Sequence, residues 1–109
     1  MGKSKRRRSQ NNPLPQGQAT PALLNEALAA HQQGDAGRAE ALYRRILDTQ
    51  PEQPDALYYL GLLKSQQGEF EAALPLLRAA SEQRPDQAVI HFNLGATAQA
   101  ANDEATALQ

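Results

Sequence analysis

The chain has no cysteine and no tryptophan, and only 5% of its 109 residues are aromatic. The absence of cysteine excludes a disulfide framework, a thiolate zinc site and a thiol nucleophile. With so few aromatic residues, the core must be built from alanine and leucine, which suits closely packed helices better than a sandwich or a barrel. The length allows one domain at most.

Long apolar segments are also missing from the sequence. No stretch reaches the roughly 18 consecutive apolar residues that a membrane span requires. The basic start of the chain is followed by polar residues, whereas a secretory signal would continue with an apolar segment. We therefore expect no membrane span and a cytoplasmic location.

Charge is distributed unevenly along the chain. Five of the 11 basic residues lie within the first eight positions, whereas all 12 acidic residues follow Ser9. Residues 1–19 show no apolar periodicity, so we expect a disordered basic and polar tail. The tail is either a contact for nucleic acid or an anionic surface, or a solubilising segment without a partner. We favour the solubilising segment, and the acidic remainder of the chain argues against binding of nucleic acid.

The strongest pattern is an internal repeat with a period of 34 residues. Shifted by this period, residues 20–53 align with 54–87 at eleven identical positions, including Gly34 with Gly68 and Pro51 with Pro85. A third copy begins at Ala88. A period held over three copies is typical of stacked helical or β units. The chain thus divides into a tail (1–19), two repeats (20–53 and 54–87) and a partial third repeat (88–109).

Each repeat is expected to form two helices. The first helix should end at Gly34, Gly68 or Asn102, because glycine and asparagine accept the left-handed conformation that closes a helix. The second helix should end before Pro51 or Pro85, since the residue before proline avoids helical backbone angles.

Start signals are present as well. Thr20 before Pro21 predicts a helix start, as does Pro54 in a first turn. Pro75 falls early in the second helix of the middle repeat, where we expect a local kink.

The spacing Leu57-x-x-Leu60-Gly61, followed by Gly68, Ala73, Leu77 and Pro85, resembles the tetratricopeptide repeat, W-x-x-L-G-x-x-Y…A-x-x-x-F…P. The resemblance covers nearly everything after Ala19. It implies an all-α fold, a right-handed α-solenoid of antiparallel helix pairs with about two and a half repeats. It also implies that small residues let the paired helices approach closely, namely Ala27, Gly61 and Gly95 on the first helices and Ala39, Ala73 and Ala107 on the second.

The sequence departs from the family pattern at several columns. Leu23, Leu57 and His91 stand in the tryptophan column, Lys64 in the tyrosine column and Glu26 in the leucine column. An acidic residue at position 26 fits a first repeat that forms an outer cap facing water.

The first helices of successive repeats in this family line a concave groove that takes extended peptides or helices. The resemblance therefore implies a non-catalytic protein–protein interaction module. Carried over by column, the groove rows are Leu24, Tyr58 and Phe92, then Asn25, Tyr59 and Asn93, then Leu28, Leu62 and Ala96.

The second of these rows is similar to an interrupted asparagine ladder, in which amides that both donate and accept hold a peptide backbone. Alternatively, Asn25 and Asn93 only satisfy neighbouring helix ends and the aromatic residues only pack. We favour the groove, because Tyr58 and Tyr59 are adjacent on one helix and cannot both face the core.

Other chemistry finds little support in the sequence. The groove rows hold no lysine or arginine, which disfavours the family's clamp for C-terminal carboxylates. His31 and His91 lack partners at metal-ligand spacing. No phosphate loop, serine elbow or Cys–His pair is present. We expect no catalysis, no cofactor and no metal.

The third repeat stops at Gln109, partway through its second helix, which leaves the apolar faces of Leu94, Ala98 and Leu108 exposed. Either the chain is the front piece of a longer array, or another subunit covers that edge, including by self-association. We favour the first. Arrays similar to this one often precede glycosyltransferase, sulfotransferase or methyltransferase domains in bacterial proteins. The main alternative function is thus a substrate-recruiting arm of a larger enzyme.

Overall fold

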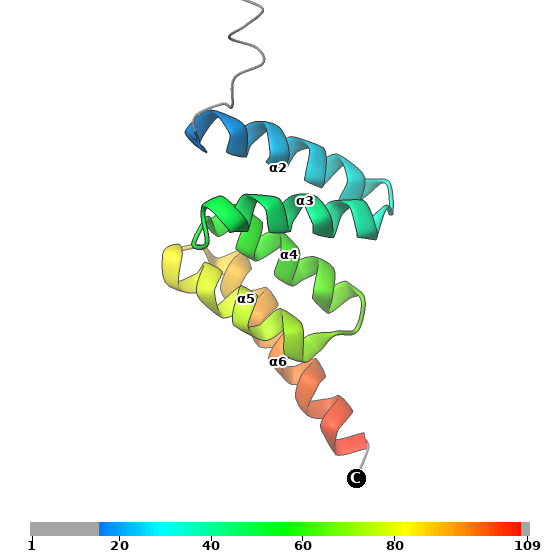
Figure 1. Ribbon diagram of the computed structural model, residues 1–109. Coiled ribbons are helices and arrows are strands. Elements are labelled where there is room, and N and C mark those ends of the chain that lie inside the picture. Colours follow the sequence, from blue (N-terminus) through cyan, green and yellow to red (C-terminus); the bar gives the residue numbers. More distant parts are fainter. Residues whose placement is uncertain (1–15, 108–109) are drawn as a thin grey trace, which may run out of the picture.

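The chain forms a row of antiparallel helices (Figure 1). The computed structural model describes residues 16–107, so most of the expected tail and Leu108 lie outside the described residues. Each helix packs against the next along the chain, and α2 also contacts α4, as α4 contacts α6. The first helices of the repeats therefore lie side by side. The helices are α2 (Gln16–Gln32), α3 (Ala36–Thr49), α4 (Pro54–Gln66), α5 (Phe70–Gln83) and α6 (Ala88–Ala107).

Two glycines make the turns inside the complete repeats. Gly34 and Gly68 have φ of 81° and 79°, the left-handed region that an L side chain rarely adopts. Each turn is closed by a backbone bond from the following residue, Asp35 N–H to Ala30 at 2.9 Å and Glu69 N–H to Lys64 at 2.9 Å. The predicted ends of α2 and α4, the first helices of the two complete repeats, are confirmed.

The second helices also end as predicted, at Thr49 and Gln83, shortly before the two prolines. Pro75 lies inside α5, which continues past it. Helix α4 begins with a cap: Gln53 accepts a hydrogen bond from the Ala56 N–H at 2.7 Å ahead of Pro54.

The start of α2 was wrongly predicted from the sequence. The helix begins at Gln16, inside the segment expected as tail, and Pro21 lies within it. Thr20 is buried and its hydroxyl accepts a hydrogen bond from Gln50 Nε2 at 2.8 Å. Because that hydroxyl ties α2 to the end of α3, it caps no helix.

The expected turn at Asn102 is also wrong. Helix α6 runs without a break from Ala88 to Ala107 and extends beyond the other helices (Figure 1). Asparagine enters the left-handed region less readily than the glycines in the same column. Continuing the helix adds one backbone bond per residue, and α6 therefore stays straight.

The core consists mainly of alanine and leucine, as the low aromatic content indicated. One cluster joins α2, α3 and α4, and a second joins α4, α5 and α6. Helices α4 and α5 approach closely at Gly61, where a Cβ would come within 2.8 Å of the Leu77 side chain. The predicted close approach is confirmed there. It is wrong for Gly95, which is exposed and has nothing within 4 Å of a built Cβ, since no second helix packs on that face of α6.

Tyr43 of α3 is the one aromatic residue that is fully buried within residues 20–107. Its side chain is fully buried and lies between His31 and Tyr59. Its hydroxyl is 2.9 Å from His31 Nδ1. Burial raises the pKa of Tyr43 from 10.0 to about 12, and the nearby Tyr59 adds to the effect.

Lys64, which replaces the family tyrosine, is buried yet paired. Its ammonium lies 3.1 Å from the Glu40 carboxylate of α3 and 3.3 Å from that of Glu69 before α5. The hydrogen bond to Glu40 raises the pKa of Lys64 and lowers the pKa of Glu40. Glu26, expected on an outer cap, is exposed and pairs with Arg38 at 2.9 Å.

The close contact at Gly61 predicts an asymmetry between two glycine substitutions. Gly61→Ala should destabilise the fold by about 1–3 kcal/mol, because the added methyl collides with Leu77. Gly95→Ala should be neutral or stabilising by up to about 1 kcal/mol, because alanine is the better helix former. Urea unfolding followed by circular dichroism measures both, and a Gly61→Ala protein as stable as the parent would contradict the packing.

The buried phenol predicts a loss of stability at high pH. Because the folded pKa of Tyr43 lies above 10.0, the folded state holds this proton more tightly than the unfolded chain does. The resulting stability is complete below pH 10 and falls as the pH rises toward 12. Tyrosinate absorbance should show a component that ionises near pH 12, and Tyr43→Phe should abolish that component. Ionisation of Tyr43 near pH 10 in the folded protein would refute its burial.

Candidate functional site

The predicted groove residues lie on the three helices that stand side by side, α2, α4 and α6. Asn25 and Phe92 are exposed, and the other six are half-buried. None is fully covered, so each predicted residue presents part of its side chain to solvent. The set, called the groove row below, is Leu24, Asn25, Leu28, Tyr58, Tyr59, Leu62, Phe92 and Asn93.

The two adjacent tyrosines of α4 contact different core clusters. Tyr59 packs against the cluster of α2, α3 and α4, and Tyr58 against the cluster of α4, α5 and α6. Their rings meet edge to face at 5.1 Å. Contrary to the expectation from their adjacent positions, both tyrosines contact the core, and both remain half-exposed.

Asn93 joins α6 to α4 through a side-chain hydrogen bond. Its Nδ2 donates to the Tyr58 hydroxyl at 2.8 Å and to the Val89 carbonyl at 3.0 Å. Burial is the main cause that raises the pKa of Tyr58, while this bond from Asn93 acts in the opposite direction. Among the described residues, the Asn93 Oδ1 oxygen has no protein partner, so it stays available as an acceptor.

Asn25 stands at the other end of the asparagine row. Its side chain is exposed and makes no hydrogen bond within residues 20–107. Its amide thus presents both a donor and an acceptor to solvent.

A cavity of about 340 Å³ opens between α2 and α4 and is lined by Leu28, His31, Gln32, Tyr59, Leu62 and Gln66. Three of these residues belong to the groove row, and the sequence analysis missed the other three. His31 bridges the two helices, since its Nδ1 lies 2.9 Å from the Tyr43 hydroxyl and its Nε2 lies 2.8 Å from Gln66 Oε1. The aligned repeats contained an indication of these residues, because glutamine occupies the same column at positions 32 and 66.

The two large hydrophobic residues that are exposed within residues 20–107 both lie on α6, at the far end of the groove row. Phe92 is 73% exposed and Val89, one turn earlier on α6, is 54% exposed. The pair lies beside the Asn93–Tyr58 hydrogen bond. Aromatic side chains left in water next to amide groups are typical of protein-binding surfaces.

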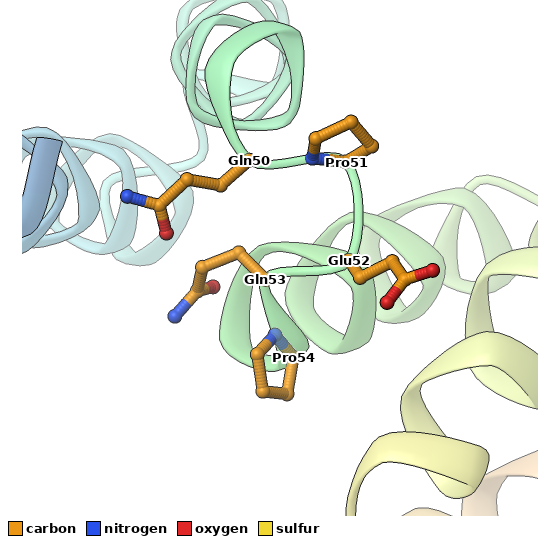
Figure 2. Close-up of a pocket in the computed structure, with 5 residues that line it drawn as sticks. All are labelled: Gln50, Pro51, Glu52, Gln53 and Pro54. Atoms are coloured by element: carbon orange, nitrogen blue, oxygen red, sulfur yellow. The ribbon is translucent and has the colours of Figure 1, made fainter.

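A larger hollow of about 550 Å³ lies at the turn between α3 and α4. Its lining comes from one stretch of chain, Gln50–Pro54, drawn as sticks in Figure 2. The polar side chains there are already used, since Gln50 bonds to Thr20, Gln53 caps α4 and Glu52 accepts from Gln83 at 3.1 Å. This hollow is therefore part of the junction between repeats.

Residues suited to other chemistry are engaged in structural contacts. His91 bonds to the Pro85 carbonyl at 2.7 Å. Within residues 16–107, no three acidic, histidine or cysteine side chains gather at distances that would hold a metal ion. None of the described helices has the length and apolar character needed to cross a bilayer.

Comparison with known proteins agrees with the helical-repeat fold. The sequence profile of the tetratricopeptide repeat matches residues 30–96. The structure is similar to that of a mutant of the O-GlcNAc transferase from Thermobaculum terrenum, with 34% sequence identity and a TM-score of 0.74. The similar region covers 79% of this chain but 16% of the transferase, so the chain spans a small part of that enzyme. The profile covers more than half of the sequence, and the chain belongs to the tetratricopeptide-repeat family.

Proposed function

We propose that this chain binds a peptide segment of a partner protein along the groove row and performs no catalysis. The observation that carries the proposal is the continuous set of partly exposed apolar, aromatic and amide side chains across α2, α4 and α6. Apolar surface interrupted by amides suits a peptide, because the amides pair with its backbone and the apolar groups contact its side chains.

The composition of the groove row favours a peptide that is not recognised through a charged terminus. The groove row contains no lysine and no arginine, so it offers no charge-assisted donor for a terminal carboxylate. Asn25, Asn93 and the Tyr58 hydroxyl instead supply neutral hydrogen bonds. Recognition of this kind reads the peptide backbone and the size of its side chains.

The state of the carboxylates supports binding over catalysis. Glu26, Glu40 and Asp55 each form an ion pair with a basic residue of their own repeat or of the next repeat. The hydrogen bond from Lys64 lowers the pKa of Glu40, whereas a general acid or base needs a pKa close to the working pH.

A second function is favoured by the similarity to the transferase. A tetratricopeptide-repeat region 34% identical to this chain belongs to an O-GlcNAc transferase. The same groove would then serve as a substrate-recruiting arm of a larger enzyme, with the chemistry carried by another domain. Both functions use the groove row in the same way and differ in what the repeats are attached to.

The groove proposal is tested with Tyr58→Ala combined with Asn93→Ala. Peptides are first selected against the parent chain by display of random sequences. The double variant should lose at least about tenfold in affinity for them, because it removes an aromatic surface and the hydrogen bond that holds it. Fluorescence anisotropy of a labelled peptide measures the change.

The matched control is Arg45→Ala with Arg78→Ala, two exposed residues of α3 and α5. It also removes two large side chains, but from the second helices of the repeats. Affinity should stay within about twofold of the parent. Equal losses in both double variants, with helical content intact, would mean that the peptide binds outside the groove row.

The mass of the natural gene product separates the two functions. An antibody against residues 20–107 should detect a species near 11.8 kDa if the chain is a free adaptor. A much larger species would support the recruiting arm and would rule out the free-standing adaptor.

A further inference from the structure

The cavity between α2 and α4 has the properties of a pocket for one peptide side chain. We infer that it takes a single uncharged side chain, apolar or aromatic, of the peptide bound along the groove row. This inference rests on the proposed function and adds what the site selects. The cavity adjoins the groove row because Leu28, Tyr59 and Leu62 belong to both.

The apolar walls of the cavity are held in place from behind. The Tyr59 ring stacks on the buried Tyr43 ring at 6.3 Å with an angle of 13° between the planes, and the Tyr58 ring braces its edge. Tyr43 is fully buried, so it fixes the position of Tyr59. A pocket formed in advance binds without the entropic cost of ordering its walls.

His31 forms part of the cavity wall and has no unpaired ring nitrogen. Gln66 Oε1 is an acceptor, so the neutral imidazole must donate from Nε2 to it at 2.8 Å. Nδ1 then accepts from the Tyr43 hydroxyl at 2.9 Å. With both nitrogens engaged, the ring presents carbon atoms to the cavity, and a polar side chain entering it would find no partner on this wall.

No lining residue carries a formal charge apart from a protonated histidine. A lysine or glutamate side chain in the cavity would therefore lose its hydration without gaining an opposite charge. The volume of about 340 Å³ lies at the low end of the roughly 300–1,000 Å³ of ligand pockets. A single side chain such as leucine or phenylalanine fits within that space.

The rim supplies contacts for the peptide backbone. Gln32 and Gln66 are exposed, and within residues 20–107 neither side-chain amide nitrogen has an acceptor. Each can donate to a peptide carbonyl beside the inserted side chain. The cavity thus combines an apolar interior with two amide donors at its mouth, which selects an apolar residue within a peptide over a free hydrocarbon.

The test uses the chain of residues 1–109 and the peptides selected by random display. The selected sequences should share one leucine-sized or phenylalanine-sized position. Replacing that residue by lysine or glutamate should weaken binding at least about tenfold, measured by fluorescence anisotropy. Leu62→Phe should fill the cavity, weaken the original peptide by a similar factor and shift renewed selection toward alanine or glycine at that position.

Leu74→Phe on α5 is the matched control, the same substitution at a half-buried leucine outside the cavity lining. It should leave both affinity and selection unchanged. Leu28→Phe fills the cavity from the opposite wall and replaces Leu62→Phe if circular dichroism shows that the latter is unfolded. The inference is overturned if a folded variant with Leu62→Phe or Leu28→Phe binds the selected peptide with the affinity of the parent.

The outcomes distinguish the pocket from the groove. Peptides that tolerate charge at every position, yet bind poorly to the variant with Tyr58→Ala and Asn93→Ala, refute the pocket and leave the groove standing. Failure to select any peptide, or selection of peptides insensitive to that double variant, refutes the proposed function and the pocket together.

Discussion

The contact between Gly61 and Leu77 is the constraint on which the rest of the structure depends. Without a Cβ at Gly61, α4 and α5 approach until the Leu77 side chain fills the space that a methyl group would occupy. Leu77 is fully buried at this contact, and Ala80 of α5 lies in the same buried cluster as Leu57 of α4. A pair of helices in tight contact presents its remaining faces to the neighbouring pairs, so α4 meets α2 and α3 on one side and α6 on the other.

Polar contacts then fix how one repeat sits on the next. The His31 ring joins α2 to α3 and α4, Lys64 joins α4 to Glu40 of α3, and Ser65 bonds to Thr97 of α6 at 2.9 Å. Hydrogen bonds and ion pairs are directional, whereas contacts between alanine and leucine permit sliding. The groove row and the cavity are consequences of this register, because their residues come from different repeats.

The sequence predicted what the repeat period controls. The 34-residue spacing located the glycine turns, the ends of the second helices and the helices that carry the groove row. It failed where position in the array matters. Asn102 and Gly95 occupy columns that form a turn and a close helix contact in the first two repeats. Helix α6 continues through Asn102, so no turn forms there and no helix approaches Gly95 closely. The cavity was missed because it depends on the His31–Tyr43–Gln66 contacts, which combine three helices and have no counterpart at the next repeat, where Ser65 replaces the histidine.

The proposed function requires that a peptide lies across the first helices of the repeats. Methyl NMR spectra of the chain with and without a selected peptide report on this contact. Binding in the groove row should produce large shifts for the methyl groups of Leu24, Leu28 and Leu62, and small shifts for Leu74 on α5 and Leu47 on α3. Shifts concentrated on the α3 and α5 leucines, with those of α2 and α4 unchanged, would contradict it.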